Sequence, residues 1–234
     1  MKKACVFLAL LLLSAGVLSA SVRLVLDVGP IYTHFTNHLS YNGSSKKYTH
    51  SENLFGVNLA LRAEFVKNFG VYAMTNFAFG NAYWEHWSSP DSYGGNRHKH
   101  GLVYAIDSQF GFFYAFKPRP KLEIALGLGL GIGGNGFNRM RRPSDKLSPA
   151  KESVSCTNIG AGLNADVSYM FSKLVGIYGG ICDTIYAPVA AAVTTKINNG
   201  EDTKTWTGPE VQNQAGIGSV SNSFSIKAGI QFVF

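Results

Sequence analysis

The residues with the clearest chemical potential are eight charged side chains in segments otherwise rich in apolar and small residues. They are Arg23, Asp27, Arg62, Glu64, Asp107, Glu123, Asp166 and Lys227. Acidic and basic groups that are buried together form ion pairs, and buried carboxylates also transfer protons. Because ion-pair networks are common without any catalytic role, we expect structural pairing, with proton conduction or catalysis as the alternative.

Two other sets of residue types are less specific. His86, His98 and His100 stand near Asp91, but this spacing is more typical of a solvated polar loop than of a metal site. The same loop holds Ser88, yet no motif places a nucleophile beside a base. We therefore predict no metal, no cofactor and no enzymatic activity.

A basic cluster lies in the polar stretch 135–154. It comprises Arg139, Arg141, Arg142 and Lys146, with Lys151 nearby. Such a cluster suits an anionic glycolipid or a host polyanion. The formal charge of the chain is +7, which includes Lys2 and Lys3. This moderate excess does not indicate a nucleic-acid partner.

The elements that must position these groups show a two-residue period. In 122–131 leucine and isoleucine alternate with Glu123, Ala125, Gly127, Gly129 and Gly131. The pattern is typical of strands with one apolar face and one small or polar face. It recurs in eight segments, at 22–34, 53–66, 70–84, 101–116, 121–134, 155–171, 175–188 and 222–234. The facing of the seventh segment stays open, because Val175, Ile177, Ile181 and Ile185 share a face with Asp183, while Tyr178, Cys182 and Tyr186 share the other.

The connections between segments alternate in length. Short turns follow the second, fourth and sixth segments, and long polar stretches follow the others, at 35–52, 85–100, 135–154 and 189–221. This alternation predicts an all-β, eight-stranded, antiparallel up-and-down transmembrane β-barrel with short periplasmic turns and long extracellular loops.

The N-terminus has the features of an export signal. Lys2 and Lys3 precede an apolar run over 4–18, which ends in Ser19, Ala20 and Ser21. We predict a signal peptide over 1–20 and an outer-membrane barrel over 21–234.

The apolar face is expected to meet lipid. The opposite face is dominated by Gly, Ala, Ser and Asn, which suits a narrow lumen rather than a soluble surface. Aromatic residues near segment ends fit interfacial girdles. They are Tyr32, Tyr83, Trp84, Trp87, Tyr114, Tyr169 and Tyr186. A soluble sandwich or barrel is the alternative for such alternation.

The last segment, SFSIKAGIQFVF, alternates throughout and ends on Phe234. With the eight-segment plan, it resembles the small eight-stranded bacterial outer-membrane families of the OmpA-barrel, OmpX and OmpW types. The resemblance implies that Phe234 is an outer-membrane assembly signal recognised by the barrel-assembly machinery. It also implies a location in the outer membrane, in contact with outer-membrane lipid.

Counting residues from the periplasmic ends puts Asp27, Arg62, Asp166 and Lys227 at similar heights. We expect Lys227, Asp27 and Arg62 to form one lumen charge cluster across the seam where the first strand meets the last. This cluster would plug the lower lumen and fix strand register. The same counting puts Cys156 and Cys182 out of disulfide reach, about seven rungs apart.

Two functions remain open on the sequence. The first is a narrow channel for small or apolar solutes, favoured by the open volume that the glycines of 127–131 suggest. The second is a surface-exposed adhesin or host-interaction protein, whose long loops bind host surface molecules while the barrel serves as a scaffold.

Overall fold

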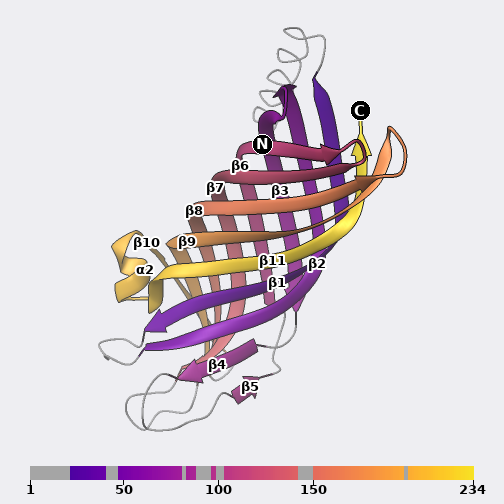
Figure 1. The fold of residues 1–234 in the computed structure, drawn as a ribbon. Coiled ribbons are helices and arrows are strands. Elements are labelled where there is room, and N and C mark those ends of the chain that lie inside the picture. The colour runs from indigo at the N-terminus through magenta and orange to yellow at the C-terminus, as the bar shows by residue number, and fades with distance from the viewer. Residues whose placement is uncertain are drawn as a thin grey trace.

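The computed structural model describes residues 22–40, 47–80, 83–87, 96–98, 103–141, 150–197 and 200–234. Eight strands form a closed antiparallel ring (Figure 1). They are β1 (Arg23–Ser40), β2 (Lys47–Val66), β3 (Phe69–Gly80), β6 (Val103–Arg119), β7 (Leu122–Arg141), β8 (Ala150–Met170), β9 (Val175–Ile197) and β11 (Ile217–Val233). Four short elements complete the description: β4 (Tyr83–Trp87), β5 (Asn96–His98), β10 (Gly200–Thr207) and α2 (Pro209–Asn213). The predicted eight-stranded barrel is confirmed.

The ring closes through β1, which pairs with both β2 and β11. One row of directly paired residues can be followed around the whole barrel. The row runs Leu24, Ala63, Val71, Phe112, Leu128, Leu163, Asp183, Phe224 and His34. It starts and ends on β1, ten residues apart, so the barrel has a shear of ten. With ~3.3 Å per residue and ~4.7 Å between strands, this shear gives a tilt of about 40°.

The turns at one end of the barrel are short, as predicted. Residues 67–68, 120–121 and 171–174 connect β2 to β3, β6 to β7 and β8 to β9. In the first turn Asn68 has φ of 68°, a conformation that asparagine tolerates better than most residues. The first strand begins and the last strand ends at this same end of the barrel, since the backbones of Leu24 and Phe234 exchange hydrogen bonds of 2.8 and 3.1 Å.

At the other end the strands continue far beyond the expected loop boundaries. β8 has 21 residues and β9 has 23, about twice the ~9–11 that a tilted membrane strand needs. All four stretches that were expected to be loops, 35–52, 85–100, 135–154 and 189–221, contain strand. The expectation was wrong because it relied on an apolar outer face, and that face is lost above the membrane.

On β8 the chemistry of the inward and outward faces changes along the strand. In the lower part of β8, Asp166 is buried in the lumen and Leu163 is exposed on the outside. In its upper part Val154 and Cys156 are buried inside, while Ser155 is exposed outside. The side-chain phase is continuous, but the solvent outside changes from lipid to water. This inversion marks the upper edge of the membrane.

The outer wall carries the apolar band that the sequence predicted. On β7 the exposed fractions of Leu126, Leu128, Leu130 and Ile132 are between 57% and 73%. The open question of the seventh segment is resolved for β9: Val175, Ile177, Ile181 and Ile185 face outward. Tyr178, Cys182 and Tyr186 consequently face the lumen, so the expectation that Tyr186 belongs to an interfacial girdle was wrong.

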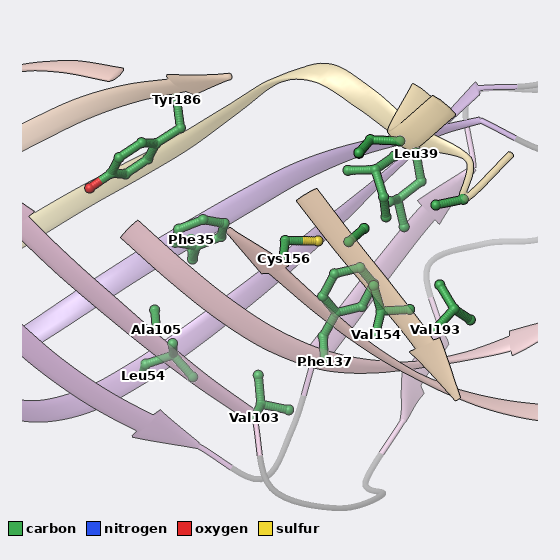
Figure 2. Packing of buried hydrophobic residues seen from close by; sticks show 14 of the residues in the cluster. Phe35, Leu39, Leu54, Val103, Ala105, Phe137, Val154, Cys156, Tyr186 and Val193 are labelled. Carbon is green, nitrogen blue, oxygen red and sulfur yellow. The ribbon is translucent and has the colours of Figure 1, made fainter. Parts of the chain in front are cut away.

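The extracellular half of the barrel holds its own apolar core (Figure 2). Phe35, Leu54 and Phe137 meet there from three strands and are at most 2% exposed. Val211 of α2 and Trp206 of β10 pack against this core. Residues 200–213 therefore form a strand and a short helix that pack on the extracellular core, in place of the expected loop (Figure 1).

Cys156 and Cys182 are thiols and lie at different levels. Cys156 stands opposite Ala191 of β9, whereas Cys182 stands opposite Asn164 of β8. Eight residues of β8 separate these levels, or roughly 26 Å at ~3.3 Å per residue. The expectation that no disulfide joins them is confirmed. Within the described part of the chain, no helix is long and apolar enough to span a membrane.

The inverted core predicts unequal effects for two substitutions on one strand. Phe137→Ala should destabilise the folded barrel by about 3–5 kcal/mol, because it leaves a cavity in a packed core. Leu128→Ala, whose side chain is 63% exposed to lipid, should cost much less. Urea unfolding in lipid vesicles measures both variants. Equal losses would contradict the extracellular core.

Candidate functional site

The lower lumen is filled by a network of ion pairs centred on Arg62. Its guanidinium lies 3.2 Å from Asp27 Oδ2 and 3.1 Å from Glu123 Oε1, and its side chain is 2% exposed. Arg23 extends the network toward the periplasmic rim, with Nη1 2.5 Å from Glu123 and 3.0 Å from Glu64. Arg62 is also 5.8 Å from the centre of the Phe113 ring. Charged groups from β1, β2 and β7 are thus joined across the barrel.

Lys227 belongs to the same level but bonds a different carboxylate from the one expected. Its Nζ lies 2.9 Å from Asp166 Oδ1, rather than on Asp27. The reason is the register: Lys227 and Asp166 both stand opposite Gly180 of β9. A Cβ at Gly180 would overlap Asp166 Oδ1, so only glycine leaves room for this ion pair. Asp27 instead accepts a hydrogen bond of 2.8 Å from Gln231 Nε2.

The described network is balanced in charge. Its cations are Arg23, Arg62, Lys117 and Lys227, and its carboxylates are Asp27, Glu64, Glu123 and Asp166. Lys117 was missing from the sequence-based set because it precedes a turn. Its Nζ reaches 2.8 Å from Glu64 Oε2. Its place beside the Pro118–Pro120 turn, at the rim where Glu64 also lies, was the signal that could have revealed it.

The middle of the lumen is closed by two tyrosine rings that lie against glycines of β7. A Cβ at Gly127 would be 2.8 Å from the Tyr72 ring, and one at Gly133 would be 2.9 Å from the Tyr186 ring. The glycines therefore make room for these rings. The open volume that the sequence suggested at this face of β7 is occupied.

Both tyrosines are held by polar residues of β6. Tyr72 OH donates to Gln109 Oε1 at 2.9 Å, and Tyr186 OH donates to Asp107 Oδ1. Asp107 also accepts hydrogen bonds from Ser223 at 3.2 Å and from Thr184 at 3.3 Å. Asp107 is thus not part of the ion-pair network but the centre of a separate hydroxyl network. Sequence reasoning missed Thr184 and Tyr186 as its partners because the facing of β9 was undecided.

A third polar group lies in the extracellular core. His50 Nε2 is 2.8 Å from Glu52 Oε1, and the His50 ring is 4.5 Å from the ring of Phe137. Burial raises the pKa of the Glu52 carboxyl well above its usual range, because the charged form loses its hydration.

Phe234 and the described part of the basic cluster lie at opposite ends of the barrel. Phe234 is 71% exposed and lies at the periplasmic end. Arg139 and Arg141 are among the last paired residues at the extracellular end of β7, but only their backbone is described. Arg142, Lys146 and residues 1–20 lie outside the described residues, as does His100. No group of three or more His, Cys, Asp or Glu residues among the described ones is placed to hold a metal ion.

Two solved structures share this architecture. The outer membrane protein OprG from Pseudomonas aeruginosa is 10% identical, with 92% of this chain and 96% of that chain covered and a TM-score of 0.56. A major outer membrane protein from Thermus thermophilus is 13% identical, with 88% and 99% covered and a TM-score of 0.54. These likenesses concern the fold. No curated protein matches the sequence.

The fold is that of small bacterial outer-membrane β-barrels, and the apolar outer band fits this membrane location. A family profile described as a domain of unknown function, DUF2715, matches residues 18–234. The chain therefore belongs to the DUF2715 family. In this chain the DUF2715 domain folds as an outer-membrane β-barrel.

Proposed function

We propose that this protein is a surface-exposed interaction protein, in which a sealed barrel carries a folded extracellular part. The observation that carries the proposal is the apolar core above the membrane, packed around Phe35, Leu54 and Phe137. A pore needs a hydrated path through the barrel at this level. A scaffold that presents a binding surface rigidly needs a packed interior there instead.

The filling of the lumen supports the same proposal at two further levels. Tyr72 and Tyr186 occupy the space beside the β7 glycines. Below them Arg62 and Lys227 are each 2% exposed. The narrow channel for small or apolar solutes loses its main support, since the glycines on which it rested are covered.

The partner class that the chemistry favours is a host polyanion. β7 ends at Arg141, so Arg139 and Arg141 belong to the extracellular end of a long strand, and Arg142 and Lys146 follow them in the sequence. Clustered guanidinium groups bind sulfate, phosphate and carboxylate groups well. The extracellular core would hold the end of β7, which carries Arg139 and Arg141, away from the membrane surface.

For the lumen charge cluster of Asp27, Arg62, Asp166 and Lys227 we propose a structural role. Its ion pairs join strands that are distant in sequence, as in Lys227 of β11 with Asp166 of β8. A one-residue slip of either strand would turn these charges toward lipid. The cluster would therefore both close the lower lumen and fix the register of the ring. Recognition of Phe234 by the barrel-assembly machinery and the absence of enzymatic activity remain predictions.

The sealed lumen predicts an absence of conductance. Purified protein inserted into planar bilayers should give no reproducible current steps above the bare membrane. Insertion is checked independently by heat-modifiable migration of protein recovered from vesicles of the same lipid. Reproducible single-channel steps from heat-modifiable protein would contradict the sealed barrel and restore the channel.

The register role predicts a large effect of Arg62→Met. This change leaves Asp27 buried without its cation and removes one of the cations of Glu123, which keeps Arg23, so we expect a loss of about 3–5 kcal/mol in unfolding free energy. Adding Asp27→Asn to the same chain should recover part of the loss. Lys204→Met, at a side chain 67% exposed, is the control and should change little. Urea unfolding in vesicles compares the variants, and an unaffected Arg62→Met barrel would refute the role.

The interaction role predicts salt-sensitive binding to a sulfated polysaccharide. Replacing Arg139, Arg141, Arg142 and Lys146 together by Gln should weaken binding about tenfold, at a few tenths of a kcal/mol per charge removed. A matched variant that replaces Lys121 and Lys173 at the periplasmic turns should bind as the parent does. Affinity chromatography with a salt gradient measures the difference. If both variants elute with the parent protein, the basic cluster is not the binding site.

A further inference from the structure

One acidic side chain lies on the lipid-facing wall. Asp183 of β9 is exposed, whereas its neighbours Cys182 and Thr184 are buried in the lumen at 1% and 0% exposure. Ile181 and Ile185, which share its face, are 49% and 58% exposed. Asp183 therefore projects outward from the apolar band.

The shear of the barrel gives the depth of this residue. Asp183 is the sixth of eight steps in the paired row that climbs from Leu24 to His34. Ten residues along a strand tilted by about 40° rise roughly 25 Å, so Asp183 lies roughly 19 Å above Leu24. Ile185 follows it two residues higher on the same strand. The carboxylate is thus below the top of the apolar band, on the outer-leaflet side.

Only one polar contact reaches Asp183 from the described residues. Asn222 of β11 donates from Nδ2 to Asp183 Oδ1 at 2.7 Å. Its flanking residues in the paired row are Leu163 and Phe224, which supply no charge. No described Lys or Arg forms an ion pair with it. The amide holds one carboxylate oxygen, and the described residues supply no hydrogen bond to the other.

A charge at this depth calls for a partner. Ionisable side chains inside the membrane are costly, and they pair with another group that offsets the cost. The apolar neighbours lower the local dielectric, which strengthens any ion pair formed there. The group that pairs with Asp183 must be cationic and must reach the wall from the membrane side.

The residues of the outer wall limit which cationic group can pair with Asp183. A second copy around an axis normal to the membrane would present the same outward residues at the same height, and the described ones there include no Lys or Arg. A divalent cation takes six or more oxygen ligands, which one carboxylate and one amide do not supply. A lipid headgroup, by contrast, is present all around the wall just above Ile185.

We propose that Asp183 and Asn222 form a binding site for the primary ammonium of a phospholipid headgroup in the outer leaflet. The ammonium donates hydrogen bonds to the Asp183 carboxylate while the acyl chains lie along Ile181 and Leu163. A quaternary ammonium lacks N–H groups, so it forms a weaker pair. The site selects phosphatidylethanolamine over phosphatidylcholine.

Native mass spectrometry of the full barrel, released from detergent and titrated with each lipid, tests this site. We expect a roughly fivefold preference for phosphatidylethanolamine, the size expected of one partly exposed ion pair. Asp183→Asn, which keeps the shape and a hydrogen bond to Asn222, should abolish the preference. Asp202→Asn, at an exposed acidic residue of β10, is the matched control and should retain it.

Three outcomes would overturn the proposal. The first is equal retention of the two lipids by the parent protein, and the second is an unchanged preference in Asp183→Asn. The third is competition by water-soluble phosphoethanolamine as strong as that of the intact lipid, which would indicate a soluble ligand. None of these results bears on conductance or on polyanion binding, so the interaction role is tested separately.

Discussion

The closure of the ring is the constraint on which the rest of this structure depends. Inside a membrane every backbone N–H and C=O group needs a partner within the protein, and a β-sheet meets this demand only when it has no edge. Here β1 provides the closure by pairing with β2 on one side and with β11 on the other. The shear of ten that results decides which side chains meet in the lumen. It also decides which residues share a height on the outer wall.

Within that ring, two regions solve the packing problem in opposite ways. In the membrane, lipid accepts apolar residues at the outside, so polar residues can fill the lumen and pair with each other. Above the membrane, water surrounds the barrel, and the same inward phase carries Phe35, Leu54 and Phe137. In the upper region the hydrophobic effect favours an apolar interior, whereas in the membrane the outer wall meets lipid, which is as apolar as a protein core. The lower lumen combines ion pairs and hydrogen bonds with a small apolar cluster that includes Tyr72, Met74 and Phe113.

Glycine has two uses in the lumen, and each follows from a specific neighbour. Gly180 leaves room for the ion pair of Lys227 and Asp166, which stand on its two neighbouring strands. Gly127 and Gly133 leave room for tyrosine rings that cross from other strands. In both cases the missing side chain is replaced by a distant one. An inward glycine in so narrow a barrel is therefore a sign of close packing rather than of open space.

The sequence by itself determined the barrel, its eight strands, its short turns and the inward position of Asp27, Arg62, Asp166 and Lys227. Each of these follows from a two-residue period, which is local and visible along one strand. Only the tertiary structure decided that Lys227 bonds Asp166, that tyrosines cover the β7 glycines and that 189–221 contains β10 and α2. Those features depend on the shear and on the change of solvent along each strand. Neither quantity is encoded in the alternation of a single segment.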